Sequence, residues 1–326
     1  MNCFVKPILA LIAALMLCGV SMSAGAQEKF PHKTMRMLVP LSAGSAIDVL
    51  ARWVAEKMGD DWGQQVIVDN RPSAGGTIAS EYVLNANPDG HTLMMISIGQ
   101  AGNATIYSKL NYDVVKDFAG ISQVASSPNV LVVLPSLGPK SVTELIALAK
   151  AKPGQLNFSS AGIGSGSHIN GEMFKVVAGI DVAHVAYKGA PEALNNVMSG
   201  AVQYFFSPVM VAAGQIRSGR VLALAVSTAG RSPMFPDVPT VAEAGVPGFE
   251  YDQWYGLVSS AKTPRLLIKA LNAEVVRIVN MPEIRERMLS QGATPKSTTP
   301  EQFDSFIRAE VKKLAPVIIA SGARVN

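Results

Sequence analysis

The sequence predicts an α/β protein of two doubly wound domains with a ligand cleft between them. Short β-like runs alternate with stretches whose apolar residues recur at helical spacing, which is typical of mostly parallel sheets covered by helices on both faces. About 300 residues remain after a predicted leader, and chains of that length usually divide into two domains. Two loops of small residues follow predicted strands, one in each expected domain.

The N-terminal segment predicts export. Lys6 is the only charged residue before Glu28, residues 8–20 are an apolar stretch, and small residues end in Ala24-Gly25-Ala26. This pattern is typical of a secretory signal peptide covering residues 1–26, cut after Ala26, and it predicts a mature protein in the periplasm. A membrane anchor is the alternative, but spanning a bilayer takes roughly 20 apolar residues.

Composition excludes several kinds of function. Cys3 and Cys18 both lie in the predicted signal peptide, so we expect no disulfide, no thiolate catalysis and no cysteine-ligated metal. The formal net charge of +4 is small and scattered, which argues against nucleic-acid binding. His32, His91 and the two later histidines show no metal-ligand spacing. We therefore expect a monomer with no metal and no cofactor.

The elements follow in order after the leader. Residues 36–40 read as a strand, and the next stretch carries one apolar stripe of a helix at Ile47, Leu50, Ala51, Val54 and Met58. Ser141 and Glu144 form a capping box that opens a helix ended by Pro153-Gly154. Further strands are predicted at residues 66–68, 92–96, 130–134, 156–159, 182–185, 203–206 and 221–226.

The last 60 or so residues read as three helices without intervening strands. Pro264, Pro282 and Pro300 each stand where a first helical turn begins, and Thr299 with Gln302 forms another capping box. This segment is expected to fold back over an earlier domain. We place the crossings between domains near 126–128 and 248–252. Residues 27–128 plus 251–326 then form the first domain and residues 129–250 the second.

Two loops are candidates for anion binding. They span residues 41–48 and 159–168, and each leads from a strand into a helix. Such turns offer unpaired backbone N–H groups and the positive end of a helix dipole. If the loops face each other across the cleft, their main-chain amides could grip one carboxylate from two sides. Either loop alone could equally be a structural turn of a doubly wound fold.

Several polar residues near these loops have two interpretations. Ser45 and Asp48 match a capping box, so Asp48 either completes the cap, orders the loop or pairs a ligand ammonium. His168 is either a packing or capping residue or a ligand contact. Lys188 is either solvated or neutralises a second carboxylate, and Ser207 is a further candidate contact at a strand end. The run 252–255 is either a pocket wall or a hinge support.

Signals for an enzyme are weak. Gly162-x-Gly164-x-x-Ser167 is similar to a dinucleotide fingerprint, but serine stands at the third glycine position. A hydrolase using Ser165 or Ser167 with His168 is the rival from a different class. Residues that are neighbours in sequence rarely give the geometry of a triad. We therefore expect a non-catalytic binding protein.

Six motifs in order give the chain its family resemblance. They are Pro40-x-x-x-Gly44-x-x-x-Asp48, Asn70-Arg71-Pro72-x-Ala74-Gly75-Gly76, Pro88-Asp89-Gly90-x-Thr92-Leu93, Ser160-Ala161-Gly162-x-Gly164-Ser165-x-x-His168, His184-Val185-x-Tyr187-Lys188-Gly189, and Pro236-Asp237-Val238-Pro239-Thr240-x-x-Glu243-x-Gly245. Over essentially its whole mature length, the chain resembles the Bug family of substrate-binding proteins of tripartite tricarboxylate transporters.

The resemblance implies a type II periplasmic-binding-protein fold and a buried carboxylate held by the two loops. The binding residues carried over by the resemblance are Ser42, Ala43, Gly44 and Ser45, with Ser160, Ala161, Gly162 and Ser165; flanking candidates are Ser97, Lys188, Gly189 and Ser207. The implied ligands are di- and tricarboxylates, acidic amino acids, nicotinate-type rings and aromatic acids. The implied partners are the membrane subunits of such a transporter or, alternatively, a sensor kinase.

Two departures from the family pattern flank the expected carboxylate site. Leu41 stands where the family typically has an aromatic residue, and Ser45 replaces a second glycine. Both changes alter the expected size of the site and the hydrogen-bond groups around it.

Overall fold

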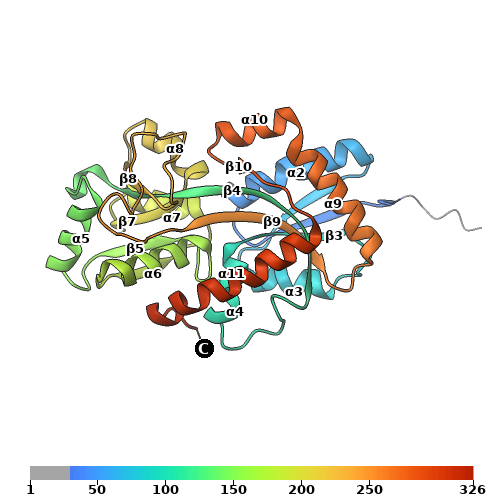
Figure 1. The fold of residues 1–326 in the computed structure, drawn as a ribbon, viewed down its shortest axis with the longest axis horizontal. Helices are drawn as coiled ribbons and strands as arrows, with labels where there is room; N and C mark the ends of the chain where they lie inside the picture. The colour runs from blue at the N-terminus through green and yellow to red at the C-terminus, as the bar shows by residue number, and fades with distance from the viewer. Residues whose placement is uncertain (1–29, 326) are drawn as a thin grey trace, which may run out of the picture. The chain divides into compact units, whose positions relative to one another are not determined.

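Strands and helices alternate along the chain in a computed structural model that describes residues 30–325 (Figure 1). The strands are β1 (Met35–Val39), β2 (Val66–Asn70), β3 (Thr92–Ser97), β4 (Phe118–Val133), β5 (Asn157–Ser160), β6 (Ala183–Ala186), β7 (Tyr204–Pro208), β8 (Leu222–Val226), β9 (Asp252–Ser260) and β10 (Thr294–Pro295). The helices are α2 (Ala46–Trp62), α3 (Thr77–Asn85), α4 (Ile98–Ile106), α5 (Val142–Ala151), α6 (Gly166–Ala178), α7 (Ala190–Met198), α8 (Val209–Arg217), α9 (Arg265–Asn280), α10 (Pro282–Ser290) and α11 (Pro300–Ser321), with 3₁₀ turns η1 (Ala74–Gly76) and η2 (Pro135–Leu137).

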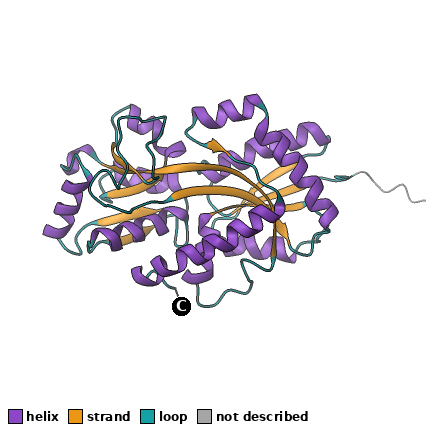
Figure 2. Ribbon diagram, viewed as in Figure 1, coloured by secondary structure: helices purple, strands orange, loops and turns teal. Residues whose placement is uncertain are grey.

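One sheet runs through the described part of the chain in the order β2-β1-β3-β9-β4-β7-β5-β6, with β8 and β10 also paired to β4. Strands β2, β1 and β3 pair in parallel, as do β7, β5 and β6. Strands β4 and β9 run antiparallel to their neighbours. The prediction of mostly parallel sheets is therefore right for the two flanks and wrong for the centre. Helices lie on both sides of the strands (Figure 2).

The long strand β4 joins two lobes. Its residues 118–128 pair with β9, whereas residues 129–133 pair with β7 and β8. We call the part built on β1, β2, β3 and β9 the first lobe, and the part built on β5, β6, β7 and β8 the second lobe. The two-domain α/β fold agrees with the sequence. We propose that the domain boundaries follow this change of partners at Pro128 and the start of β9, which supports the predicted crossings.

Local signals explain where the helices begin. Ser141 accepts a hydrogen bond from the Glu144 amide at the start of α5, and Thr299 with Gln302 forms the complete capping box of α11. Pro282 and Pro300 occupy the first turns of α10 and α11, where the missing N–H costs no helical hydrogen bond. Helix α2 buries its predicted apolar stripe, which includes Leu50, against the sheet.

The second lobe is filled by an aromatic cluster. Phe174 lies edge-on to Tyr204 and Phe206, with ring centroids 5.9 and 5.3 Å away, and Phe206 stacks on Phe249. All four rings are buried. Strands β7 and β5 and helix α6 are thereby packed together, which fixes the loop that joins β5 to α6.

The C-terminal helices pack on both lobes. Helices α9 and α10 lie beside α2 and β4 in the first lobe, while α11 contacts α4 of the first lobe, α6 of the second and β4 between them (Figure 1). The C-terminal segment was predicted to fold back over one earlier domain, and it packs on both lobes. The short strand β10 separates α10 from α11, which the sequence did not indicate.

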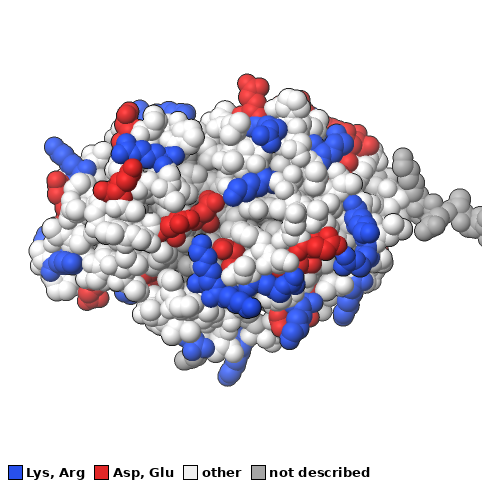
Figure 3. All heavy atoms as spheres, viewed as in Figure 1, with Lys and Arg blue, Asp and Glu red and all other residues white. Residues whose placement is uncertain are grey.

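Two further comparisons with the sequence concern the ends of the chain and its charge. The predicted signal peptide and its cut after Ala26 lie outside the described residues. Within residues 30–325, every helix is too short or too polar to cross a membrane. Basic and acidic side chains are interspersed on the face shown in Figure 3.

Candidate functional site

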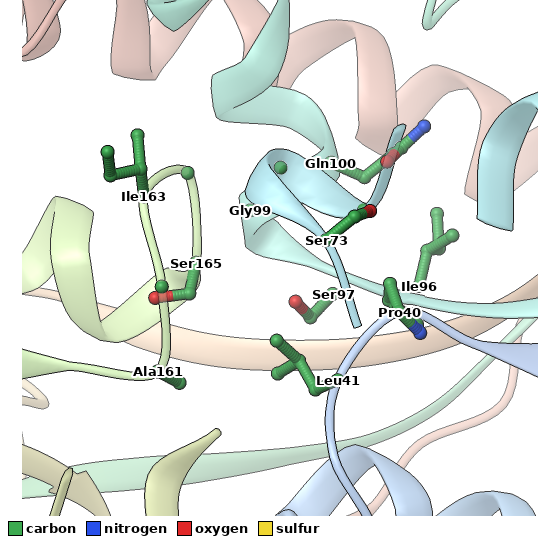
Figure 4. A pocket seen from close by; sticks show the side chains of 14 residues that line it. Pro40, Leu41, Ser73, Ile96, Ser97, Gly99, Gln100, Ala161, Ile163 and Ser165 are labelled. Carbon is green, nitrogen blue, oxygen red and sulfur yellow. The ribbon is translucent and has the colours of Figure 1, made fainter. Parts of the chain in front are cut away.

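A small cavity lies where loops from the two lobes meet. Its first chamber, of about 30 Å³, lies between residues 161–165 of the second lobe and residues 40–41, 73–76 and 96–100 of the first (Figure 4). A second chamber, of about 20 Å³, adjoins it, because Leu41, Ser97, Ala161 and Ser165 line both. Since a cavity of ~10–15 Å³ holds one water, the two chambers together have room for only a few polar groups.

Three helices begin at this cavity with a serine. Ser45, Ser97 and Ser165 are the N-cap residues of α2, α4 and α6, and all three line the second chamber. The cavity also meets Gly76, Ala190 and Pro208, which lie at the starts of α3, α7 and α8. This convergence follows from the fold, because helices that follow parallel strands begin at the same edge of the sheet.

No charged side chain lines either chamber within the described part of the chain. The walls are apolar residues, glycines, serines, Gln100, Gln253 and Tyr255. The first amides of each helix have no acceptor within their own helix, and the helix dipole places partial positive charge there. The site is therefore positive through its main chain alone.

The loop before α2 is held by an ionised carboxylate. Asp48 accepts hydrogen bonds from the Gly44 amide and the Asn70 side chain, each at 2.9 Å, and pairs with Arg52 at 3.0 Å. Burial acts to raise the pKa of Asp48, but the bonds from Arg52, Gly44 and Asn70 outweigh it and hold the pKa below 3.8. Asp48 orders the loop and does not line the cavity.

The predicted capping box of Ser45 and Asp48 is wrong. The Ser45 side chain makes no cap hydrogen bond, and its hydroxyl is buried without a hydrogen-bond partner among the described residues. The Asp48 carboxylate reaches the Gly44 amide in place of the cap. The Ser45 hydroxyl consequently stays available at the wall of the second chamber.

The loop before α6 is held by neutral groups. The amides of Ala161, Gly162 and Gly164 donate to Ser167 Oγ at 3.0 Å, Ser160 Oγ at 3.1 Å and His168 Nδ1 at 3.2 Å. These amides were predicted to grip a carboxylate, and they are instead used inside the loop. Further donors of this kind are expected among the first-turn amides of the helices, although the His168 amide in α6 already donates to Ser165 Oγ.

The buried His168 and the half-buried His184 complete this support. The His168 and His184 rings lie 4.2 Å apart, and His184 Nε2 lies 2.6 Å from Ser160 Oγ. Burial lowers the pKa of His168 to about 3 and that of His184 to about 4, so both rings are neutral at pH 7. His168 is thus a packing residue. Its ring accepts from Gly164 and only its amide reaches Ser165, which is not the arrangement of a nucleophile with its base.

The lobes touch directly beside the cavity. The Gly75 amide donates to Ile163 O at 2.8 Å, and Tyr107 donates to the same oxygen at 3.3 Å. Within the first lobe, the Asn103 side chain donates to Gly75 O. Gly75 has φ +64°, and a Cβ there would overlap the Tyr107 ring. Only glycine therefore allows this approach, which closes the cleft.

A second contact between lobes uses residues that were predicted to bind ligand. The Ser42 amide donates to Lys188 O at 3.1 Å, and a Cβ on Gly189 would overlap the Ser42 hydroxyl. Ala43 and Gly44, which follow Ser42 in the chain, are exposed. Neither chamber is lined by Ser42, Ala43, Gly44 or Gly189.

The predicted residues now divide into two groups. Ser45, Ser97, Ala161, Gly162 and Ser165 line the chambers. The others do not line either chamber. The Ser160 hydroxyl bonds Gly162 and His184, the buried Ser207 hydroxyl donates to Pro208 O, and the Lys188 side chain is exposed. The places of the remaining predicted residues are given above: Ser42, Ala43, Gly44, Asp48, His168 and Gly189.

Sequence reasoning missed part of the wall. Ser73, Gly75 and Gly76 lie in the second of the six motifs, and Gly99 and Gln100 follow the flagged Ser97. Gln253 and Tyr255 project from the same face of β9, two residues apart, into the second chamber. Their run was predicted to be either a pocket wall or a hinge support, but it was not recognised as part of a strand.

Comparison with known proteins gives a consistent result. A model of the family described as "Tripartite tricarboxylate transporter family receptor" matches residues 50–323. Protein BugT of Bordetella pertussis is 33% identical over 301 residues, covering 92% of each chain.

Two solved structures share this fold. R. palustris Rpa4515 with adipate has a TM-score of 0.87 at 30% identity, covering 90% of this chain and 98% of that one. MatC (Rpa3494) from Rhodopseudomonas palustris with bound malate has a TM-score of 0.85 at 30% identity, covering 89% of this chain and 100% of that one.

Proposed function

We propose that this chain, which belongs to the tripartite tricarboxylate transporter receptor family, captures a small organic carboxylate in the cavity between its lobes. Members of this family are periplasmic solute-binding proteins. The proposed place of action is the periplasm, and the proposed partners are the membrane subunits of a tripartite tricarboxylate transporter. The adipate and malate in the two similar structures support a dicarboxylate as the ligand class.

The observation that carries the proposal is the uncharged cavity at which helices α2, α4 and α6 begin. Helix N-termini stabilise an anion through their free amides and their dipoles. A cationic ligand would find no carboxylate in the chamber walls of the described chain. The site therefore favours a carboxylate and disfavours an amine.

The energies are sufficient for useful affinity. A hydrogen bond to a charged group contributes about 1.5–3 kcal/mol. A few such bonds from the helix amides, less the entropy lost on closure, reach the ~8 kcal/mol of a micromolar complex.

Closure is the proposed mechanism of capture. The Gly75–Ile163 and Ser42–Lys188 bonds hold the lobes together beside the cavity, so an acid cannot enter while these bonds are formed. The lobes must therefore separate for entry. A ligand favours the closed state only through contacts that it gains there, and the cavity supplies such contacts from both lobes.

The decisive test removes one helix amide. Ala46 is the first residue of α2, a position at which proline is tolerated, and Ser45 already has the extended backbone that precedes a proline. Ala46→Pro takes away one donor at the second chamber, and its ring narrows the space. We expect affinity for the acid to fall at least about tenfold, the equivalent of ~1.4 kcal/mol.

The acid itself is found first, by denaturing freshly purified protein and identifying any released acid by mass spectrometry. Binding is then measured by calorimetry for the wild type, for Ala46→Pro and for the matched control Arg265→Pro. Arg265 is the exposed first residue of α9, away from the cavity, so the control should bind normally. Equal affinity for all three proteins would reject the helix N-termini as the carboxylate site.

A further inference from the structure

Three buried polar atoms without hydrogen-bond partners among residues 30–325 meet at the second chamber. They are Ser45 Oγ, Gln253 Oε1 and Tyr255 Oη, and their residues are at most 5% exposed. Leaving such atoms unpaired in a protein interior costs free energy, so native proteins rarely do so without reason. Their convergence on one space indicates that a group from outside the chain pairs with them.

The three atoms come from two elements of the first lobe. Ser45 occupies the N-cap position of α2, whereas Gln253 and Tyr255 lie on the central strand β9, where Tyr255 pairs with Ser97. Helix α6 closes the opposite side, and its Gly166 lies so close to the Gln253 amide that a Cβ would overlap it. Leu41 and Ala161 mark the border with the first chamber, and Figure 4 shows them with Ser97 between the two lobes.

The chemistry of these atoms selects the missing group. The hydroxyls of Ser45 and Tyr255 both donate and accept, whereas Gln253 Oε1 only accepts. Burial raises the pKa of Tyr255, while the neighbouring Gln253 side chain acts to lower it, so the phenol keeps its proton. A carboxylate, which only accepts, would leave Gln253 Oε1 unpaired. A hydroxyl satisfies all three, because it donates once to Gln253 Oε1 and accepts from both Tyr255 and Ser45.

Size argues against an aromatic ring in this chamber, and charge argues against an ammonium. A chamber of about 20 Å³ holds one group the size of a water molecule, not an aromatic ring. An ammonium could donate to Gln253, but the described chamber walls contain no carboxylate to balance its charge. A buried charge without a partner is strongly disfavoured.

We infer that the second chamber is a hydroxyl subsite, so that the ligand is a hydroxycarboxylate whose hydroxyl bonds Ser45, Gln253 and Tyr255. This inference rests on the proposed function, because the carboxylate of the same molecule occupies the adjoining space at the helix N-termini. Ser45, which stands where a glycine is expected, is then a specificity residue of this chain.

The test compares acids that differ by one group. Protein stripped of endogenous ligand by unfolding and refolding is titrated with lactate and propionate, 2-hydroxyglutarate and glutarate, and citrate and tricarballylate, with glutamate as the amino counterpart. In at least one pair the wild type should bind the hydroxy acid about tenfold or more tightly than its partner, because the unhydroxylated acid leaves the three atoms unpaired. Glutamate should bind more weakly than 2-hydroxyglutarate.

Variants then locate the effect. Tyr255→Phe and Ser45→Ala should reduce the preference to about threefold or less, because each lowers the affinity for the hydroxy acid more than the affinity for its unhydroxylated partner. Tyr204→Phe is the matched control, since its buried hydroxyl also has no hydrogen-bond partner among the described residues but lies away from both chambers. It should keep the full preference.

Stability without ligand separates binding from a structural role. In the ligand-free protein the Tyr255 hydroxyl makes no hydrogen bond of normal geometry and interacts only with the neighbouring Gln253 side chain, so the urea midpoint of Tyr255→Phe should not fall clearly below that of the wild type. A clear fall, or an equal loss of affinity for both members of a pair, would overturn the subsite. Equal wild-type binding of both members of every pair, or tighter binding of glutamate, would reject the inference and leave carboxylate capture standing. Binding of no acid at all would reject the proposed function itself.

Discussion

The loops before α2 and α6 occupy equivalent places in the two lobes, yet different chemistry holds each of them. The first depends on the ionised Asp48, bonded to Gly44, Asn70 and Arg52. The second depends on neutral serines and the His168 ring. The first leaves the Ser45 hydroxyl unpaired at the cavity, whereas the hydroxyls of the second are bonded within the loop. A doubly wound fold supplies the position of such a loop, and local side chains decide what it offers a ligand.

Among the substitutions that test this difference between the loops, replacement of Asp48 should have the largest effect on stability and ligand affinity. Asp48→Ala leaves the Gly44 amide and the Asn70 side chain without their acceptor, and we expect a loss of about 2–4 kcal/mol in the free energy of unfolding. Ligand affinity should fall with it, because the loop before α2 loses its order. Urea unfolding and calorimetry measure the two effects.

Asp69→Ala is the control for Asp48→Ala. Like Asp48, Asp69 pairs with arginine, in its case with both Arg36 and Arg71. It is partly exposed and lies away from the cavity. We expect a smaller loss of stability and unchanged ligand affinity. If Asp48→Ala bound ligand as tightly as the wild type, the ordered loop would not be needed for capture.

Acid should affect the two loops in different pH ranges. The folded pKa values of His168 and His184 lie below the usual 6.5, so the unfolded chain binds more protons, and stability falls as pH drops from about 6.5 toward 4 and 3. Each histidine adds up to ~1.4 kcal/mol per pH unit to this slope. The pKa of Asp48 is lowered, so its contribution persists between pH 6.5 and 4 and is lost only as pH falls below 3.8.

Urea unfolding at a series of pH values tests this difference. His168→Phe should be less stable at pH 7, because the Gly164 amide loses its acceptor, and its stability should fall less steeply between pH 6.5 and 4. Asp48→Asn should keep the steep fall in that range. Identical pH profiles for His168→Phe and the wild type would contradict the assignment.

The smallest effect is expected at Lys188. Its carbonyl, not its exposed side chain, accepts the Ser42 amide across the cleft. Lys188→Ala should therefore change the free energy of unfolding by less than about 0.5 kcal/mol and leave affinity nearly unchanged. A tenfold loss of affinity in calorimetry would instead restore the prediction that Lys188 neutralises a second carboxylate.

Much of the fold was predictable because its signals are local. The apolar stripe of α2, the cap of Ser141 and the prolines of the C-terminal helices act within a few residues of sequence. Strand β4 was only partly recognised, since its first residues read as a domain crossing. Its pairing with β9 joins segments more than a hundred residues apart, and no local pattern indicates such a partner.

The site was predictable as a place but not as a set of contacts. Gly and Ser before α2 and α6 correctly indicated two loops at the cleft. Tertiary contacts decide which hydroxyls face the cavity. Asp48, for example, accepts from the Gly44 amide, and the Ser45 side chain makes no cap hydrogen bond. Gln253 and Tyr255 reach the chamber from a strand far along the chain, so only the assembled sheet reveals them.

The chamber walls of the described chain carry no charged side chain, and this should make the proposed ligand affinity insensitive to salt. Dissolved ions weaken attraction between exposed charges, but they act much less on buried dipoles. A receptor that holds its anion by enclosed main-chain groups should keep its affinity as the ionic strength outside the cell rises and falls.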